Sequence, residues 1–306
     1  MSKKNELMKG RKGITLIALV ITIIVLLILA GVSIAMLTGD NGILKQANKA
    51  KSETSSAKED EETKLKQNED YITESLINWD TVSEDIYKLS DDGVLSIKDK
   101  ETAKKYTNIK IPSEINGTKI TTIDERGFEC FTNLKNVIIP EGITELKEIS
   151  FNSCTSLEYI KLPQSLTKIG SLSFQNCPRL KEIIIPDNVT NIESFAFADC
   201  IDLKTVKLGK GLKEIGTQAF GDTGIQTITI PSNVEKLGWG VFEYCKNLEN
   251  IYIESPSINF GGDVFGSKTY RIKAGSTIYV RNSNVASLLK GNYNEEDTVI
   301  SENYNW

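Results

Sequence analysis

Apolar residues recur along this chain with a fixed period of 23 residues between about positions 120 and 265. The clearest marker is one phenylalanine per unit, and a single interval is shortened, to 22 residues. These markers are Phe128, Phe151, Phe174, Phe197, Phe220, Phe242 and Phe265. A constant period of roughly 20 to 50 residues predicts a solenoid, in which each unit buries its apolar side against its neighbours.

Other apolar columns keep the same period. A Leu, Ile or Val stands eight residues before the marker in the first six units, and a second stands five residues before it. Each unit then continues into an apolar-x-x-apolar-x-apolar stretch, such as Leu157 to Leu162. A proline usually closes the unit, which fits the end of a strand because proline cannot donate to a ladder. The prolines are Pro140, Pro163, Pro186 and Pro231.

The same stretch predicts one exposed sheet face. Leu157, Ile160 and Leu162 should face inward, which leaves Tyr159 and Lys161 among the outward positions of a period-2 strand. Apolar side chains at solvent positions often mark interaction sites, although strand propensity alone could also place them there. The partner-binding residues predicted on this face are Ile138, Tyr159, Lys161, Glu182, Ile184, Lys207 and Tyr252.

The chain before the repeats opens with a basic segment, 1–13, which carries five Lys and Arg against one Glu. Residues 14–38 then carry no charge at all. A stretch of this length can span a hydrocarbon core of about 30 Å, and the basic flank keeps 1–13 in the cytoplasm. We therefore predict a transmembrane helix with the repeats outside the cell. A cleaved secretory signal with a site at Ser33–Ala35 is the alternative.

Three further segments complete the predicted organisation. Residues 39–78 are rich in Lys, Glu, Ala and Gln with a thin apolar stripe, which predicts a solvated helical stalk. Residues 79–119 form the N-terminal cap and include a hairpin around Asp92-Gly93. The repeats occupy 120–266, and 267–306 form the C-terminal cap, with a strand at 277–280 followed by a short helix.

Composition narrows the functions that remain. The chain has 306 residues, a net charge of −5 and no histidine, which excludes Ser-His-Asp and Cys-His catalysis. Carboxylate-based hydrolysis stays open, but no basic block points to nucleic acid, and we predict no cofactor and no metal. Most of the five cysteines follow the repeat period, which favours core positions over metal ligands, with an oxidised pair left possible.

The unit from Leu166 to Pro186 and the entry segment from Ile111 to Ile123 resemble BspA-like leucine-rich repeats. The resemblance implies a β-rich leucine-rich repeat solenoid of about six 23-residue repeats, preceded here by the transmembrane helix and stalk. It also implies a secreted or surface-exposed, non-enzymatic protein that acts in binding and adhesion. The expected ligand is an extracellular protein or glycan.

The segment from Lys12 to Val20 resembles a type IV prepilin leader. In that family a prepilin peptidase cuts after the glycine, here Gly13, and the new N-terminus is methylated, here Ile14. Two positions depart from the pattern, since Ile14 replaces the usual Phe and Ala18 the usual Glu. The resemblance implies prepilin peptidase and pilin-like subunits as partners, with a minor pilin-like role as the second functional hypothesis. An uncleaved signal anchor is the alternative.

Overall fold

A computed structural model of the chain describes residues 74–265, 273–281, 283–292 and 298–302. Contacts within the chain divide it into two units, 1–77 and 78–306, and the fold described here is that of the second unit. Among the described residues, no helix is both long enough and apolar enough to cross a membrane.

Several of the predicted segments lie outside the described residues. The leader with Gly13 and Ile14 is one, the apolar segment 14–38 is another, and residues 39–73 of the predicted stalk are the third.

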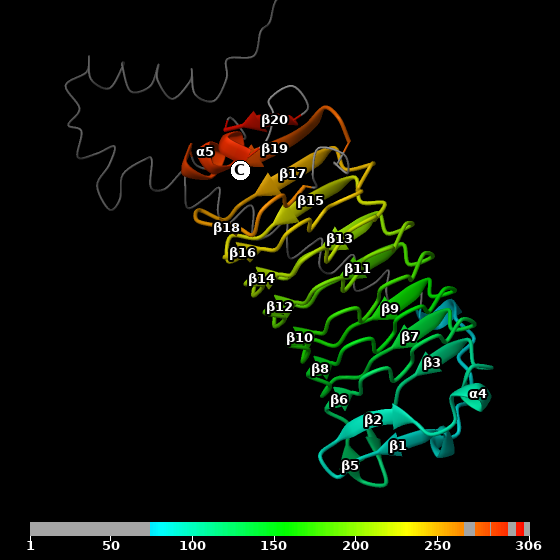
Figure 1. The fold of residues 1–306 in the computed structure, drawn as a ribbon. Coiled ribbons are helices and arrows are strands. Elements are labelled where there is room, and N and C mark those ends of the chain that lie inside the picture. The colour runs from blue at the N-terminus through cyan, green and yellow to red at the C-terminus, as the bar shows by residue number, and fades with distance from the viewer. Residues whose placement is uncertain (1–73, 266–272, 282, 293–297, 303–306) are drawn as a thin grey trace, which may run out of the picture. The chain divides into compact units, whose positions relative to one another are not determined.

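The second unit is a solenoid, as the 23-residue period predicts, and it has about seven turns where about six repeats were expected (Figure 1). Each turn contributes one strand of three to five residues to a parallel array, and these strands follow one another along the molecule as three sheets, β3-β7-β9, β11-β13 and β15-β17-β19-β20. The array comprises β3 (Asn108–Lys110), β7 (Asn136–Ile138), β9 (Tyr159–Lys161), β11 (Glu182–Ile184), β13 (Thr205–Lys207), β15 (Thr227–Ile230), β17 (Asn250–Ile253), β19 (Ser276–Val280) and β20 (Thr298–Ser301).

Every repeat turn also contributes a second, two-residue strand on another side of the solenoid. With the hairpin strands β1 (Tyr87–Leu89) and β2 (Val94–Ile97) they form one sheet in the order β1-β2-β6-β8-β10-β12-β14-β16-β18. The two-residue strands are β6 (Thr122–Ile123), β8 (Glu145–Leu146), β10 (Lys168–Ile169), β12 (Asn191–Ile192), β14 (Glu214–Ile215), β16 (Lys236–Leu237) and β18 (Asn259–Phe260). Sequence analysis did not predict this sheet, because two residues are too short to display a period of two.

The core is a ladder of the marker phenylalanines. All seven rings are buried, and neighbouring rings stack nearly parallel, with centroids between 4.9 and 6.0 Å apart. Around them lie the other apolar columns, including Leu157, Ile160 and Leu162, which are buried as the strand pattern predicts. One apolar core therefore runs through all the turns.

Two residues before each of the first six marker phenylalanines, the backbone has a left-handed conformation. Ile149, Leu172 and Phe195 have φ between 58° and 63°, a region that bulky side chains rarely adopt. Their amides donate to the next turn, for example from Ile149 to the carbonyl of Ser171 at 2.9 Å and from Leu172 to that of Ser194 at 3.0 Å. These hydrogen bonds between turns offset the local strain, which costs roughly 1–2 kcal/mol per residue.

The N-terminal end is closed by a hairpin, as predicted. Strands β1 (Tyr87–Leu89) and β2 (Val94–Ile97) pair antiparallel across a turn in which Gly93 has φ of 82°, and β2 then pairs in parallel with β6. The remaining elements of this end are η1 (Glu84–Ile86), α4 (Lys100–Ala103), β4 (Glu114–Ile115) and β5 (Thr118–Lys119).

At the C-terminal end, β19 contains the predicted strand and α5 (Ser283–Asn292) the predicted helix. Val285, Ala286 and Leu289 of α5 are buried. Strand β20 was not predicted, and it pairs in parallel with β19 as a further rung of the array. It falls outside the 23-residue period, so no repeat position marks it.

Candidate interaction surface

The outward side chains of β7, β9, β11, β13, β15 and β17 form what we call the long-strand face. All seven predicted partner-binding residues lie on it: Ile138, Tyr159, Lys161, Glu182, Ile184, Lys207 and Tyr252. The register places Ile138 beside Lys161 and Ile184 beside Lys207, in one column along the solenoid. The two lysines are exposed and the other five residues are half-buried, so the face is accessible in its apolar positions too.

Sequence analysis missed one residue of this column. Tyr279 of β19 is in register with Tyr252, and the two rings stack with centroids 4.7 Å apart and planes 9° from parallel. Tyr279 lies 27 residues after Tyr252 and therefore falls outside the 23-residue period. The alternation Thr277-Ile278-Tyr279-Val280 was the signal that could have found it.

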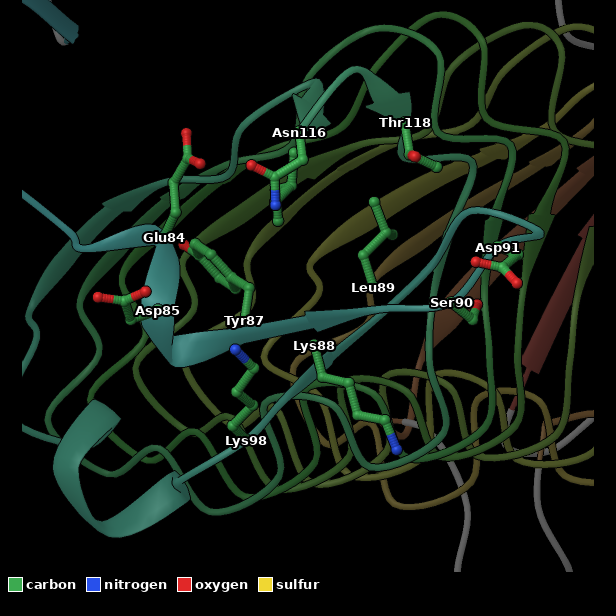
Figure 2. A pocket seen from close by; sticks show the side chains of 11 residues that line it. Glu84, Asp85, Tyr87, Lys88, Leu89, Ser90, Asp91, Lys98, Asn116 and Thr118 are labelled. Atoms are coloured by element: carbon green, nitrogen blue, oxygen red, sulfur yellow. The ribbon is translucent and has the colours of Figure 1, made fainter.

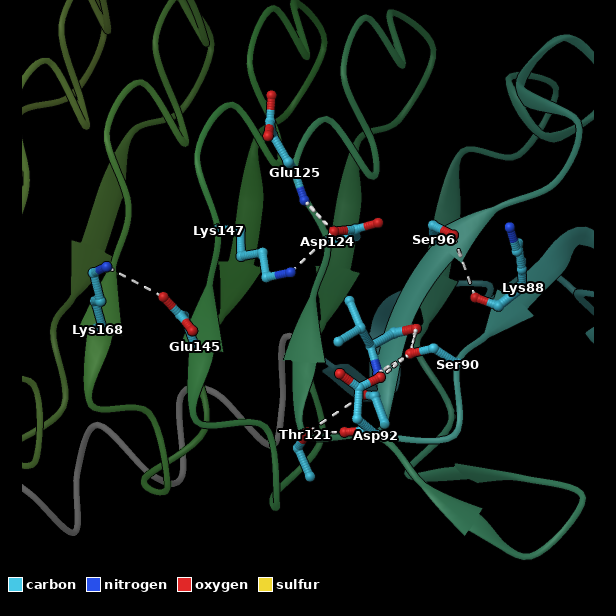
Figure 3. A network of polar contacts seen from close by, with 12 residues as sticks. Lys88, Ser90, Asp92, Ser96, Thr121, Asp124, Glu125, Glu145, Lys147 and Lys168 are labelled. Atoms are coloured by element: carbon cyan, nitrogen blue, oxygen red, sulfur yellow. Dashed lines mark hydrogen bonds and ion pairs between the residues drawn. The ribbon is translucent and has the colours of Figure 1, made fainter.

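The sheet that contains β8, β10, β12, β14 and β16 presents a different surface, which we call the short-strand face. Its outward side chains form ion pairs from turn to turn. The ammonium of Lys168 lies 3.2 Å from Glu145 on one neighbouring turn and 3.0 Å from Glu193 on the other. Figure 3 shows the contact of Lys168 with Glu145 and that of Lys147 with Asp124, at 3.3 Å.

The contact between Lys168 and Glu193 shifts the pKa values of both residues. The hydrogen bond to Glu193 raises the pKa of Lys168 above its usual value. Partial burial would raise the pKa of Glu193, but the contacts with Lys168 and Ser171 outweigh it and lower the pKa. Lys147, Lys168, Lys213 and Lys236 on this face are each paired with a carboxylate of a neighbouring turn.

Four of the cysteines form part of the core. The Sγ atoms of Cys154 and Cys177 donate to the carbonyls of Phe128 and Phe151, at 3.2 and 3.3 Å. Burial raises the pKa of Cys177 well above its usual value and that of Cys245 to about 11. All five thiols are free, so no pair is oxidised in this structure.

Cys130 corrects the prediction that the cysteines are core residues. It is exposed, with φ of 58°, and lies two residues after its phenylalanine, whereas the buried cysteines lie three residues after theirs. A shift of one position in the turn moves the side chain from the core to the surface. Within the described residues, no group of three or more Cys, Asp or Glu side chains could hold a metal ion.

A cavity of about 310 Å³ lies at the N-terminal hairpin (Figure 2). Its lining includes Tyr87, Lys88, Lys98 and Asn116, and the Tyr87 ring points toward the side that carries Glu84 and Asn116. The Tyr87 hydroxyl is buried and has no hydrogen-bond partner among the described residues. Burial, with a smaller effect from Tyr106, raises the pKa of Tyr87, so this phenol is neutral at physiological pH.

The chain has the fold of a leucine-rich repeat solenoid, since it combines repeated turns, parallel strands and a ladder of buried apolar side chains. The family model described as "BspA type Leucine rich repeat region" matches the chain in six copies, over residues 96–190 and 167–284. The chain belongs to this family. Solenoids of this class generally act as non-enzymatic scaffolds for interactions.

A solved structure agrees on the fold, and a second shows a weaker similarity. A leucine-rich repeat protein of T. pallidum has a TM-score of 0.59 and 23% identity, over 72% of this chain and 100% of that one. A leucine-rich cell surface protein of Faecalibacterium prausnitzii is 24% identical, with a TM-score of 0.42, over 59% of this chain and 56% of that one. No curated protein sequence matches the chain.

Proposed function

We propose that this chain is an anchored surface protein of a bacterial-type cell that binds an extracellular protein or glycan without catalysing a reaction. The observation that carries the proposal is the long-strand face. Its outward positions include Ile138, Tyr159, Ile184 and Tyr252, in a family whose repeats form a scaffold for interactions. Apolar and aromatic side chains in one accessible column favour a role in binding, since such patches often mark interaction sites.

The proposal places the partner on this face because the short-strand face is already neutralised by its own ion pairs. Lys168, for example, contacts carboxylates on both neighbouring turns. A partner that docked there would have to displace these contacts. On the long-strand face, a partner can cover half-buried apolar side chains and gain the free energy of removing them from water.

Anchoring is the second part of the proposal and rests on the sequence. The uncharged segment 14–38 behind the basic leader supports membrane attachment, and the caps at 79–119 and 267–306 would close the repeats at 120–266. A helical stalk over 39–78 would hold the binding domain away from the membrane.

A minor pilin-like subunit is the second candidate function. The run from Gly13 to Ile17 favours it, because it resembles the site that prepilin peptidase cuts, whereas Ala18 lacks the carboxylate that major pilins use in assembly. Mass spectrometry of the mature N-terminus, from cells that contain the peptidase, tests it. A methylated terminus at Ile14 supports this role, and an intact Met1 or Ser2 contradicts processing.

A capture experiment tests the binding face. The full chain serves as bait for extracellular proteins and glycans, and the affinity of the recovered partner is then measured. The double variant Tyr159→Ala with Ile184→Ser should lose binding while its melting temperature changes little. The matched control, Lys168→Gln with Lys236→Gln on the short-strand face, should bind as the natural chain does. Equal affinity in both variants would place the site elsewhere.

A further inference from the structure

We propose that the cavity at the N-terminal hairpin binds one uncharged sugar ring, such as the terminal hexose of a glycan. Its lining comes from η1, from β1 and the turn after it, from the residue that follows β2, and from the β4–β5 hairpin (Figure 2). None of these lining residues belongs to the long-strand face. The inference therefore goes beyond the proposed function and adds a second site.

The size of the cavity limits the ligand to a small molecule. Its volume of about 310 Å³ lies at the lower limit of the roughly 300–1,000 Å³ that ligand pockets occupy. Two apolar side chains contribute to the lining, the half-buried Leu89 and the buried Ile115. A sugar ring carries C–H groups on its faces and hydroxyl groups around its edge. One ring can therefore cover these apolar side chains while its edge meets polar groups.

The polar side chains around the cavity are free to contact such a ligand. Within the described residues, four of them make neither a hydrogen bond nor an ion pair: Glu84, Lys98, Asn116 and Thr118. The short-strand face differs, since Lys168 there is paired with carboxylates on both neighbouring turns. The cavity thus offers unused donors and unused acceptors together. Hydroxyl groups can satisfy both kinds, because each donates one hydrogen bond and accepts others.

The order of the charges around the cavity favours an uncharged ligand. Glu84 and Asp85 precede β1 and Asp91 follows it, while Lys88 lies in the strand and Lys98 opposite its beginning. Figure 2 shows the same order along the strand, with carboxylates at both ends and the two ammonium groups between them. A zwitterion needs opposite signs at the two ends of its site, and a ligand of one sign would meet like charges, which is unfavourable. An uncharged ligand avoids both penalties.

A buried polar group at the cavity also lacks a partner. Tyr87 is 3% exposed, and its hydroxyl has no hydrogen-bond partner among the described residues. Its ring points toward Glu84 and Asn116 (Figure 2), which are exposed side chains and can move aside. A ligand oxygen that then accepts a hydrogen bond from the phenol would remove the free-energy cost of an unsatisfied buried hydroxyl.

Ligand-observed NMR titration of the purified full chain, in a detergent without a sugar headgroup, tests the inference. The probes are the methyl glycosides of glucose, galactose and mannose. The matching uronic acids and protonated amino sugars keep each ring and add one charge, and serine serves as a zwitterion. We expect at least one neutral hexose to bind with a Kd on the order of 1 mM, as befits so small a ligand.

The charge of the probe should decide its affinity. The charged analogues of the hexose that binds should have a Kd higher by about tenfold, because each brings a like charge near the lining residues. Binding of the neutral hexose should not change as salt rises, since salt screens interactions between charges.

Variants locate the site. Asn116→Gly removes the amide and keeps the turn, because Asn116 has φ of 51° and glycine accepts this conformation. Thr118→Val removes the hydroxyl from β5 with little change in shape, and Tyr87→Phe removes the phenol oxygen. Each should raise the Kd by about threefold to tenfold, the effect of one lost hydrogen bond. Thr205→Val, at an exposed strand position outside the cavity, is the matched control and should leave the Kd unchanged.

The outcomes separate this inference from the proposed function. The inference is overturned if no neutral hexose binds, if a charged analogue or serine binds more tightly, or if Asn116→Gly and Thr118→Val leave the Kd unchanged. The double variant Tyr159→Ala with Ile184→Ser should bind the hexose as the natural chain does, and loss of binding there would place the sugar on the long-strand face. If the hexoses fail while that double variant still abolishes partner capture, the proposed function stands and only this inference falls.

Discussion

The long-strand face and the short-strand face of this solenoid share one core but present different kinds of surface. On the short-strand face, Lys168 bridges Glu145 and Glu193 of the neighbouring turns, so the charges of successive repeats neutralise each other. On the long-strand face, isoleucine and tyrosine occupy outward positions where a soluble sheet needs neither. A repeat scaffold can therefore keep its charges paired on one side and leave the other side available for a partner.

A substitution in the shared core should lower the free energy of unfolding more than any substitution on either face. Phe174 is fully buried and stacks between Phe151 and Phe197. Phe174→Ala should lower the free energy of unfolding by about 3–5 kcal/mol, because it removes buried area and leaves a cavity. Chemical denaturation of the variant and the natural chain measures this difference. A loss under 1 kcal/mol would contradict the phenylalanine ladder as the core.

A smaller core change should leave the long-strand face intact. Cys177 is buried behind the turn and its thiol donates to the carbonyl of Phe151. Cys177→Ala should lower the free energy of unfolding by about 1–2 kcal/mol, as expected for a modest cavity. Partner binding should be unchanged. Stoichiometric zinc in the untagged natural protein would instead show that the cysteines form a metal site.

The short-strand face should respond least to substitution, and its response should depend on pH. Lys168→Gln removes both ion pairs and should cost about 0.5 kcal/mol, since exposed pairs contribute little. The depressed pKa of Glu193 means that its contribution is present above the ordinary value of 4.5 and is lost as pH falls through the folded value.

The stability that Lys168 contributes has the opposite pH dependence, because the pKa of this residue is raised in the folded protein. Its contribution is present below the ordinary value of 10.5 and is lost as pH rises through the folded value. The difference between natural chain and Lys168→Gln should therefore be greatest near neutral pH and vanish at acidic pH. Thermal unfolding of both proteins across this range measures it, and a difference that persists below the pKa of Glu193 would show that the ion pairs are not its source.

The sequence predicted the long strands and their inward residues because alternation over six residues is a strong signal. Leu157, Ile160 and Leu162 are buried as expected, and the seven predicted face residues all lie on the long-strand face. Whether those residues bind a partner is a question of affinity, which no pattern in one chain decides.

Other features could not be predicted, for identifiable physical reasons. The short strands are only two residues long, and their pairing depends on stacking of the turns rather than on local pattern. Ile149, a β-branched residue, has a left-handed conformation that its propensity opposes and that hydrogen bonds between turns impose. Tyr279 is in register with Tyr252 but follows it by 27 residues, so the 23-residue period does not mark it.

Hydroxyl-radical footprinting, with and without the partner recovered by capture, tests the central claim most directly because it needs no substitution. The account predicts that partner binding lowers the oxidation of Tyr159 and Tyr252 on the long-strand face. Trp239 lies outside that face and is 39% exposed, so it should remain as reactive as before. Protection of Trp239 with no change at the two tyrosines would contradict the account and place the partner away from the long-strand face.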